Sequence, residues 1–192
     1  MKKYNVIYAD PPWKYSSGVY QDSNRIERML CSQYSSMDKK EIENLPIENI
    51  SDKDCALFLW VTDSHLKDGI ELMEKWGFSY KTIVFIWTKK TKNGITCANI
   101  GAWTMKNCEI CIFGTKGNML KYKKINNIYQ LVEAERTNHS KKPEEVRNRI
   151  DLLFGNIPKI ELFARENAIG WDVFGDEVEN SIEFESHIGD TK

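Results

Sequence analysis

The sequence predicts an α/β protein with a predominantly parallel central sheet that is flanked by helices. Three observations support this prediction. Short apolar, β-prone runs alternate along the chain with segments whose apolar residues recur at helical spacing. The runs are continuously apolar, as in strands covered on both faces. Long polar loops follow two of the predicted strands. Alternating strands and helices are typical of a doubly wound sheet, because parallel strands need crossover connections.

The first predicted strand, residues 6–9, is apolar and stops at Asp10. Pro11 and Pro12 cannot continue a central strand, because they lack the amide donor. The side chains of Asp10–Trp13 are therefore expected at the carboxyl end of a strand, which is where ligands bind in open α/β sheets. A polar stretch over residues 14–36 follows, and its length indicates a functional loop.

The middle of the chain contains further helices and strands. A short helix is expected around Ile42 and Leu45, with Ser36 or Asp38 near its cap. A buried strand over residues 55–61 leads into a helix over about 64–76, which Gly77 ends. The next expected segments are a strand over 80–87, a lysine-rich loop over 89–102, a strand over 108–114 and a basic connection over 116–127.

The last helix is predicted from the amphipathic pattern that follows Pro143. Proline is tolerated in the first turn of a helix, and Glu144 and Glu145 suit its positive dipole end. Gly155 breaks the pattern, and residues 159–164 form the last expected strand. The composition changes only near the end of the chain, so we expect one domain over 1–178 and an acidic tail over 179–192.

Composition limits the classes of function. The 192 residues carry a formal net charge of −1 and are 41% hydrophobic, so the chain is globular, and any nucleic-acid contact must use local basic patches. No segment has the length and apolarity of a membrane span, and no signal-peptide core is present, so a cytoplasmic protein without a membrane partner is expected.

The five cysteines do not indicate a disulfide framework, because their number is odd. Cys108 and Cys111 have the spacing of a zinc ligand pair. They lie in a predicted strand, however, where residues three apart face opposite sides. No second pair exists, so both are interpreted as core cysteines, and no metal is expected.

The sequence DPPW over residues 10–13 combines two hydrogen-bond acceptors with a flat aromatic side chain. Asp10 as a carboxylate and the carbonyl of Pro11 are two acceptors side by side, which suits a group with two hydrogens such as an exocyclic amine. Trp13 offers a flat face for a planar ring, worth about 1–3 kcal/mol per stacked base. The alternative is a proline turn after a buried strand, with Trp13 in the core.

Several motifs occur in an order that resembles a known family. DPPW after an apolar strand looks like the catalytic motif of S-adenosylmethionine-dependent amino-group methyltransferases. The detailed match is to the MT-A family, named for the seventy-kilodalton adenosine methyltransferase subunit. The resemblance runs from about residue 4 to 177 and is carried by YADPPW, QYSSM, LFLWVT, GFSYKTIVFIWTK, GAW, CIFGTKGN, RTNHSKKPEEV, KIELFAR and GWDVFGDE.

This resemblance implies a fold and a set of cofactor-binding residues. The fold is Rossmann-like with a permuted motif order, in which the catalytic motif comes first and the cofactor strand last. The catalytic residues would be Asp10, Pro11, Pro12 and Trp13, and the cofactor would be S-adenosylmethionine. By the same resemblance, the cofactor would contact Asp10 and Pro11, and Lys116 would lie near its carboxylate. Further contacts would come from a residue within the last strand and from polar groups that follow it, namely Glu161, Arg165, Asn167, Asp176 and Glu177.

Two loops are expected to bind the substrate. By resemblance, Tyr34 lies on a loop that closes near the target base, and Trp103 and Lys106 lie on a second such loop. Trp103 could instead plug the sheet edge. Clusters of lysines, including Lys89 and Lys90, could follow phosphates or form solvated faces. His139 and Lys141–Lys142 precede the last helix, where they could hold a phosphate or cap the helix.

The favoured function is methylation of the N6 amino group of adenine in nucleic acid. The Lys, Asn and Ile bias is typical of AT-rich genomes, and the short architecture favours DNA over RNA. Alternatives are an RNA adenine methyltransferase, a catalytically silent binding subunit of an active homologue, or methylation of another planar amine. A homodimer or a heterodimer with a related chain is compatible with the small surface of the domain.

Overall fold

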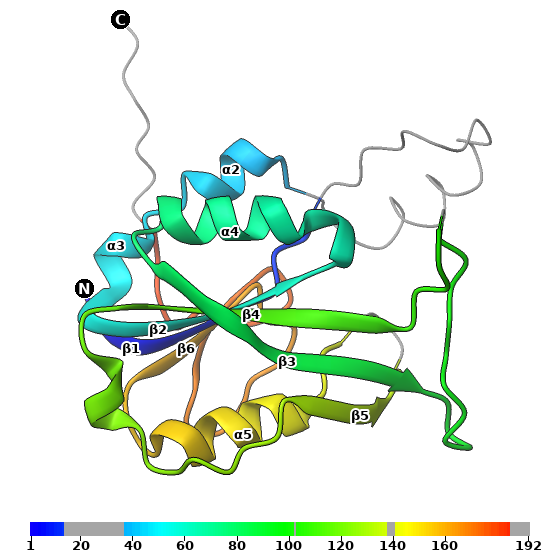
Figure 1. Cartoon of the computed structure of the whole chain (residues 1–192). Coiled ribbons are helices and arrows are strands. Elements are labelled where there is room, and N and C mark those ends of the chain that lie inside the picture. Colours follow the sequence, from blue (N-terminus) through cyan, green and yellow to red (C-terminus); the bar gives the residue numbers. More distant parts are fainter. Residues whose placement is uncertain (14–36, 102, 138–140, 185–192) are drawn as a thin grey trace, which may run out of the picture.

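The chain forms a mixed sheet with helices on both faces (Figure 1). The computed structural model describes residues 1–13, 37–101, 103–137 and 141–184. Within these residues the sheet has seven strands in the order β5-β3-β4-β2-β1-β6-β7. Their bounds are β1 Tyr4–Ala9, β2 Ser51–Val61, β3 Ser79–Lys90, β4 Cys108–Lys116, β5 Leu131–Glu135, β6 Lys159–Leu162 and β7 Asp172–Phe174.

The sheet is mostly parallel, which confirms the predicted fold class. β1 is parallel to β2 and β6, β6 to β7, and β3 to β5. β4 is the exception, because it runs antiparallel to both of its neighbours, β2 and β3. The carboxyl ends of β1, β2, β3, β6 and β7 therefore meet at one edge of the sheet, together with the amino end of β4. We call this edge the carboxyl edge.

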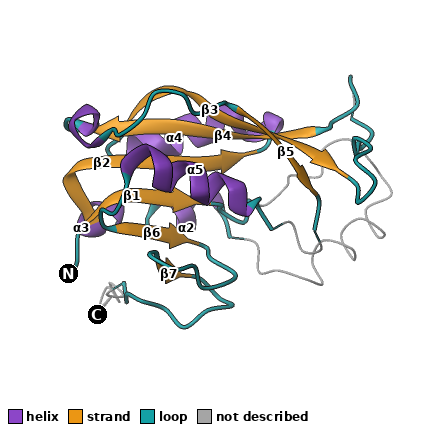
Figure 2. Ribbon diagram, turned by 90° about the horizontal axis from the view of Figure 1, so that it is seen from below, coloured by secondary structure: helices purple, strands orange, loops and turns teal. Residues whose placement is uncertain are grey.

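Helices cover the two faces of the sheet unequally. α2 (Lys39–Glu43), α3 (Ile47–Ile50) and α4 (Leu66–Lys75) lie on one face, and α5 (Glu144–Phe154) lies on the other (Figures 1 and 2). Two short 3-10 helices, η1 (Asp63–His65) and η2 (Met119–Tyr122), lie in connections. None of the helices in the described ranges has the length and apolarity needed to cross a membrane.

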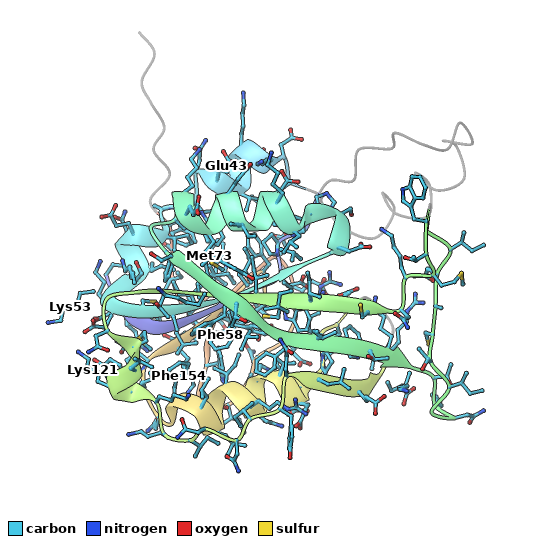
Figure 3. All side chains as sticks on the ribbon, viewed as in Figure 1. Glu43, Lys53, Phe58, Met73, Lys121 and Phe154 are labelled. Carbon is cyan, nitrogen blue, oxygen red and sulfur yellow. The ribbon has the colours of Figure 1, made fainter. Side chains whose placement is uncertain are left out.

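Two apolar cores result from the alternation of side chains along the strands. Ile7 and Ala9 of β1 pack with α2, α3 and α4 in one cluster, whereas Val6 and Tyr8 pack with α5 in the other. Figure 3 shows Met73 on α4, and Phe58 and Phe154 between the sheet and α5. The rings of Phe58 and Phe154 meet edge to face at 6.2 Å.

The expected helix boundaries are close to those observed. Asp38 is the N-cap of α2, and its backbone N–H donates to the Glu41 carboxylate at 2.7 Å. α5 starts directly after Pro143 and ends at Gly155, whose φ of 71° suits the left-handed region.

Some elements lack a signal in the sequence. β5 and β7 are too short for a hydrophobic period to be recognised. β2 starts at Ser51, four residues before the predicted start at Cys55. The prediction missed these residues because Ser51–Asp54 are polar. The packed chain also extends beyond residue 178. The Ser181 N–H donates to the Val173 carbonyl at 2.8 Å, and Ile182 is buried against the α4 core.

Candidate active site

Asp10 stands at the carboxyl edge, directly after β1. Its carboxylate accepts a hydrogen bond from Nζ of Lys142 at 2.7 Å, and the side chain is 24% exposed. Pro11 is buried, and its carbonyl accepts the N–H of Trp13 at 2.9 Å. The two prolines fix φ at this corner, so the carboxylate and the carbonyl are held with little freedom.

Lys142 lies between two carboxylates. Its ammonium is 2.7 Å from Asp10 and 3.1 Å from Oε2 of Glu109, the second residue of β4. Glu109 also binds Lys89 of β3. Because β4 runs antiparallel, its amino end reaches the carboxyl edge beside Asp10. Two acids and two lysines from four separate segments thus form one ionic network.

Burial and charge set the pKa values of this network. Burial raises the pKa of Asp10 above its ordinary value, although Lys142 acts in the opposite direction. Burial would lower the pKa of Lys142, but Asp10 and Glu109 outweigh it, and that pKa is raised. Burial would raise the pKa of Glu109, but Lys142 and Lys89 lower it below its ordinary value. Lys142 is therefore held as a cation next to Asp10.

A crevice opens beside Asp10 on the α5 face of the sheet. Tyr8, Asp10 and Glu161 alternate onto this face from β1 and β6, and α5 and the residues before it supply the opposite wall. The crevice is lined by Tyr8, Asp10, Lys141, Lys142, Arg147, Glu161, Phe163, Arg165 and Glu166. Asp10, Glu161 and Arg165, which the sequence assigns to the site, are thus brought together.

Arg147 of α5 holds the two acids of the crevice floor. Its guanidinium donates to Glu161 at 2.9 Å and to Glu166 at 2.5 Å, and Lys141 binds Glu166 at 2.6 Å. Burial raises the pKa of Glu161, while Arg147 acts against it. Lys141 and Arg147 lower the pKa of the more exposed Glu166. The crevice is therefore lined by closely packed carboxylates and cationic side chains.

Trp13 lies beside the crevice and does not line it. Its ring packs at the edge of the α4 core and stacks on the His65 imidazole, with centroids 5.7 Å apart and planes inclined by 16°. Its indole N–H donates to the Trp60 carbonyl at 3.4 Å. Of the two alternatives left open by the sequence, the structure gives a half-buried Trp13 with one face covered by His65.

Lys116 does not lie at the site. It ends β4, and the antiparallel register places it beside Cys55, at the opposite edge of the sheet from Asp10. It lies five positions after Cys111, the partner of Trp60, so the distance between the two along the strand is roughly 17 Å. Its ammonium binds the Ser51 hydroxyl at 2.6 Å. The structure therefore places Lys116 away from Asp10, where Lys142 is the neighbouring lysine, and the expected contact of Lys116 with the cofactor carboxylate stays a prediction.

The other expected cofactor residues follow strands that end at the carboxyl edge. Arg165 lines the crevice, and Asn167 is exposed in the same loop after β6. Asp176 and Glu177 follow β7 and are exposed. Pro12, beside Pro11, is half-buried. These residues share the edge with Asp10, and the roles assigned to them stay predictions.

The expected substrate residues lie mainly on the β3–β4 hairpin, which extends beyond the carboxyl edge (Figure 1). Trp103 is 97% exposed, and Lys106 binds Asp63 at 2.9 Å. Lys90 binds Glu133 at 2.8 Å, and Lys89 binds Glu109. Trp103 thus does not plug the sheet edge, and the three lysines have acidic partners within the chain. Tyr34 and His139 lie outside the described residues.

Sequence reasoning did not assign Glu109, Arg147 or Lys142 to the site around Asp10. Each is far from Asp10 in the sequence, and each occupies a position with an ordinary local explanation, in a strand, a helix or a helix start. The available signal was the pair Lys141–Lys142 before a helix that must return to the sheet edge.

The interpretation of Cys108 as a core residue is wrong. Cys108 is exposed at the start of β4, whereas Cys111 is buried. They face different environments, as expected for a strand. In the part of the chain that the structure describes, no group of three His, Cys, Asp or Glu side chains is placed to hold a metal ion.

Comparisons with known proteins agree with the geometry. Residues 4–177 match the sequence profile of the MT-A70 family. The chain is 36% identical over 195 residues to the Type II methyltransferase M.MunI of Mycoplasma sp, and the match covers 95% of this chain and 81% of that protein.

Two less similar relatives are eukaryotic proteins. The N(6)-adenosine-methyltransferase catalytic subunit METTL3 of Homo sapiens is 28% identical over 180 residues, and the match covers 92% of this chain and 28% of the human protein. A probable N(6)-adenosine-methyltransferase MT-A70-like protein of Oryza sativa is 29% identical, and 23% of its length is covered. The family profile spans the strand before Asp10, the crevice and the loop after β7, and the chain therefore belongs to the MT-A70 family of methyltransferases.

Proposed function

We propose that the protein transfers a methyl group from S-adenosylmethionine to the N6 amino group of adenine in nucleic acid. The observation that supports this most directly is the Asp10 carboxylate, which Lys142 orients at the mouth of a crevice. The related N(6)-adenosine-methyltransferases carry this activity in their names, and the present chain matches them over 91–92% of its own length.

The crevice has the chemical groups that S-adenosylmethionine needs. The cofactor carries a carboxylate, an ammonium group, ribose hydroxyls and a methyl group on a positively charged sulfur, which supplies the electrophilic carbon. Lys142 and Arg165 are suited to its carboxylate, and Glu161 is suited to accept from its hydroxyls. Buried charged groups need partners of opposite charge, and the carboxylates of the crevice have them in Lys142 and Arg147.

Asp10 and Pro11 act on the amine. The adenine amino group is a poor nucleophile, because its lone pair is delocalised into the ring. A carboxylate has about four acceptor positions and a carbonyl two, so Asp10 and Pro11 each keep capacity beyond the bonds with Lys142 and Trp13. Hydrogen bonds from the amine to these oxygens favour a tetrahedral nitrogen and stabilise the positive charge that develops on it.

Trp13 and the hairpin complete the proposed substrate site. His65 covers one face of the Trp13 ring, so a base would stack only on the other face. A base in a duplex would have to be flipped out to reach Asp10. Trp103, exposed beyond the carboxyl edge, offers a second stacking surface for a neighbouring nucleotide.

We further propose DNA as the polymer, rather than RNA. The chain is 36% identical to the Type II methyltransferase M.MunI and 28% identical to human METTL3, so its sequence is more similar to the former. A dimer, formed with a second copy or with a related chain, would provide additional surface for a long polymer.

One experiment tests both proposals. The purified chain is incubated with S-adenosylmethionine that carries a labelled methyl group, in separate reactions with DNA, RNA and adenosine. Nucleosides are then released and separated. We expect label in N6-methyladenine from DNA. Label in RNA alone would replace DNA as the substrate, and label in another base, or in none, would contradict the proposed reaction.

A further inference from the structure

Trp60 stands directly beside the Asp10 corner. In the register of β1 and β2, Ala9 pairs with Leu59, so the next residues, Asp10 and Trp60, are neighbours at the carboxyl edge. The Trp60 side chain is 1% exposed and belongs to the core on the α5 face. This is the face from which Lys142, two residues before α5, reaches Asp10.

The Trp60 ring contacts the ammonium of Lys142. Nζ of Lys142 lies 5.5 Å from the ring centroid, within the range in which a cation is attracted to the face of an aromatic ring. The same nitrogen bonds to Asp10 at 2.7 Å and approaches Glu109 at 3.1 Å. The carboxylates fix two directions of the ammonium, and the indole limits its movement on a third side.

Tyr8 fixes the orientation of the Trp60 ring. The indole N–H of Trp60 donates to the Tyr8 hydroxyl at 2.7 Å. Tyr8 is 1% exposed and packs edge to face on Trp171, with centroids 6.0 Å apart. Burial raises the pKa of Tyr8 well above its ordinary value, so the hydroxyl stays neutral and remains available as an acceptor.

We infer that Trp60 is a positioning residue whose indole, oriented by Tyr8, holds the Lys142 ammonium between Asp10 and Glu109. The inference rests on the proposed function, in which Lys142 orients Asp10 and binds the cofactor carboxylate. A lysine side chain loses considerable rotamer entropy when it is fixed. If the Trp60 ring already restricts the lysine side chain, less side-chain entropy is lost when the cofactor binds.

A purely structural role of Trp60 has a different consequence. The ring also packs edge to face on Trp87 at 6.5 Å, so its removal lowers stability in any case. A structural effect on the site would persist when Lys142 has lost its charge. An effect that acts through Lys142 would disappear in that background.

A double-mutant cycle separates the two roles. The dissociation constant of S-adenosylmethionine is measured by calorimetry for the wild type, Trp60→Leu, Lys142→Met and the double variant, and thermal unfolding shows that each is folded. We expect Trp60→Leu to weaken binding roughly tenfold in the wild-type background, the upper part of the cation–π range. With Lys142→Met present, the same change should alter binding less than twofold.

Two further variants keep the test decisive. Trp60→Phe retains an aromatic face and should recover most of the affinity that Trp60→Leu loses. Trp76→Leu is the matched control, because it removes an equally large buried side chain from the core on the other face of the sheet. Its effect on cofactor affinity should be small and equal in both backgrounds.

If Trp60→Leu does not fold, Trp60→Phe and Tyr8→Phe are carried through the same cycle. Tyr8→Phe should then weaken binding only while Lys142 is present.

The outcomes distinguish this inference from the proposed function. Equal losses from Trp60→Leu in the presence and absence of the Lys142 charge would overturn the inference and leave the proposed function intact. The same holds if Trp60→Phe is as impaired as Trp60→Leu. A wild-type protein that binds no S-adenosylmethionine would overturn both.

Discussion

Asp10 combines two demands that oppose each other. The carboxylate must be ionised to accept hydrogen bonds from an amine, yet burial raises its pKa, and Lys142 is the cation that favours the ionised form. The site therefore depends on a long-range ion pair, between residues that are 132 positions apart in the sequence.

The pH dependence of methyl transfer follows from this balance. Because the pKa of Asp10 is raised, protonation should begin at higher pH than for an ordinary aspartate, and the rate should fall as pH falls through that pKa. Lys142→Met removes the cation that opposes the shift, so the acid limb should move to still higher pH. The measurement is the single-turnover rate against pH. An acid limb that stays in place in Lys142→Met would contradict the role of the ion pair.

The two lysines discussed above give a matched pair of variants. Lys142→Met should weaken the binding of S-adenosylmethionine by about tenfold or more, the value of a charge-assisted hydrogen bond of roughly 1.5–3 kcal/mol. Lys116→Met, at the opposite edge of the sheet, should leave the dissociation constant within twofold. Calorimetric titration measures both. A larger effect for Lys116→Met would restore the role that its motif implies.

At the scale of residues, the sequence predicted positions best where prolines restrict the backbone. The prolines that end β1 place Asp10 at the carboxyl edge, and Glu161 and Arg165 reach the same crevice. Lys142 and Glu109 were not assigned to the site, because no local pattern reports a contact between segments that only the fold brings together. The position of Lys116 relative to Asp10 was not predictable for a related reason, since a motif gives no strand direction.

Strand direction is the decisive property at the scale of elements. CEICIFGTK in β4 is as apolar and as β-prone as the parallel strands, so its sequence does not distinguish the two directions. Running antiparallel, β4 brings Glu109 to Asp10 and takes Lys116 away from it. The overall α/β class was predictable from the alternation of segments, whereas this reversal depends on the β3–β4 hairpin.

The ion pair between Arg147 of α5 and Glu161 of β6 is expected to stabilise the fold. Arg147 is the cation for Glu161, and both side chains are largely buried. Arg147→Met leaves a buried carboxyl without its partner and should lower the free energy of unfolding by about 3–5 kcal/mol at neutral pH. Chemical denaturation measures the loss. Lys67→Met, which removes an exposed ion pair on α4, is the control and should leave stability unchanged.

Because burial already raises the pKa of Glu161, the Arg147→Met variant should regain part of its stability at lower pH, where Glu161 is protonated. The sign follows from the loss of the cation that favours the charged form. A variant whose stability falls at acidic pH as steeply as that of the wild type would show that Arg147 does not act on Glu161.

At the scale of the whole molecule, the Asp10 crevice and the most exposed aromatic side chain of the described residues lie toward the same edge of the sheet. Trp103 lies in the connection between β3 and β4, which extends beyond the carboxyl edge (Figure 1), and its side chain is exposed. Trp103→Ala should weaken the binding of a nucleic-acid substrate by about 1–3 kcal/mol, as expected for the loss of one stacked base, while cofactor affinity and thermal stability stay unchanged. Fluorescence anisotropy with a labelled oligonucleotide measures this, and unchanged oligonucleotide affinity would remove Trp103 from the substrate site.

At this scale the packed part of the chain extends farther than its composition predicts. The packed chain continues to Phe184, whose ring meets Phe174 at 4.7 Å, although the acidic composition after residue 178 predicted a tail. Composition averages over a segment, whereas single apolar residues such as Ile182 decide whether it packs.

The most direct test of the account is single-turnover methyl transfer by the wild type and Asp10→Asn, with N6-methyladenine quantified by mass spectrometry. Asparagine keeps the shape of the side chain and removes its charge. We expect the wild type to form N6-methyladenine and Asp10→Asn to lose at least about 100-fold in rate, with S-adenosylmethionine affinity within a few-fold of the wild type. An Asp10→Asn variant that methylates adenine at nearly the wild-type rate would contradict the account.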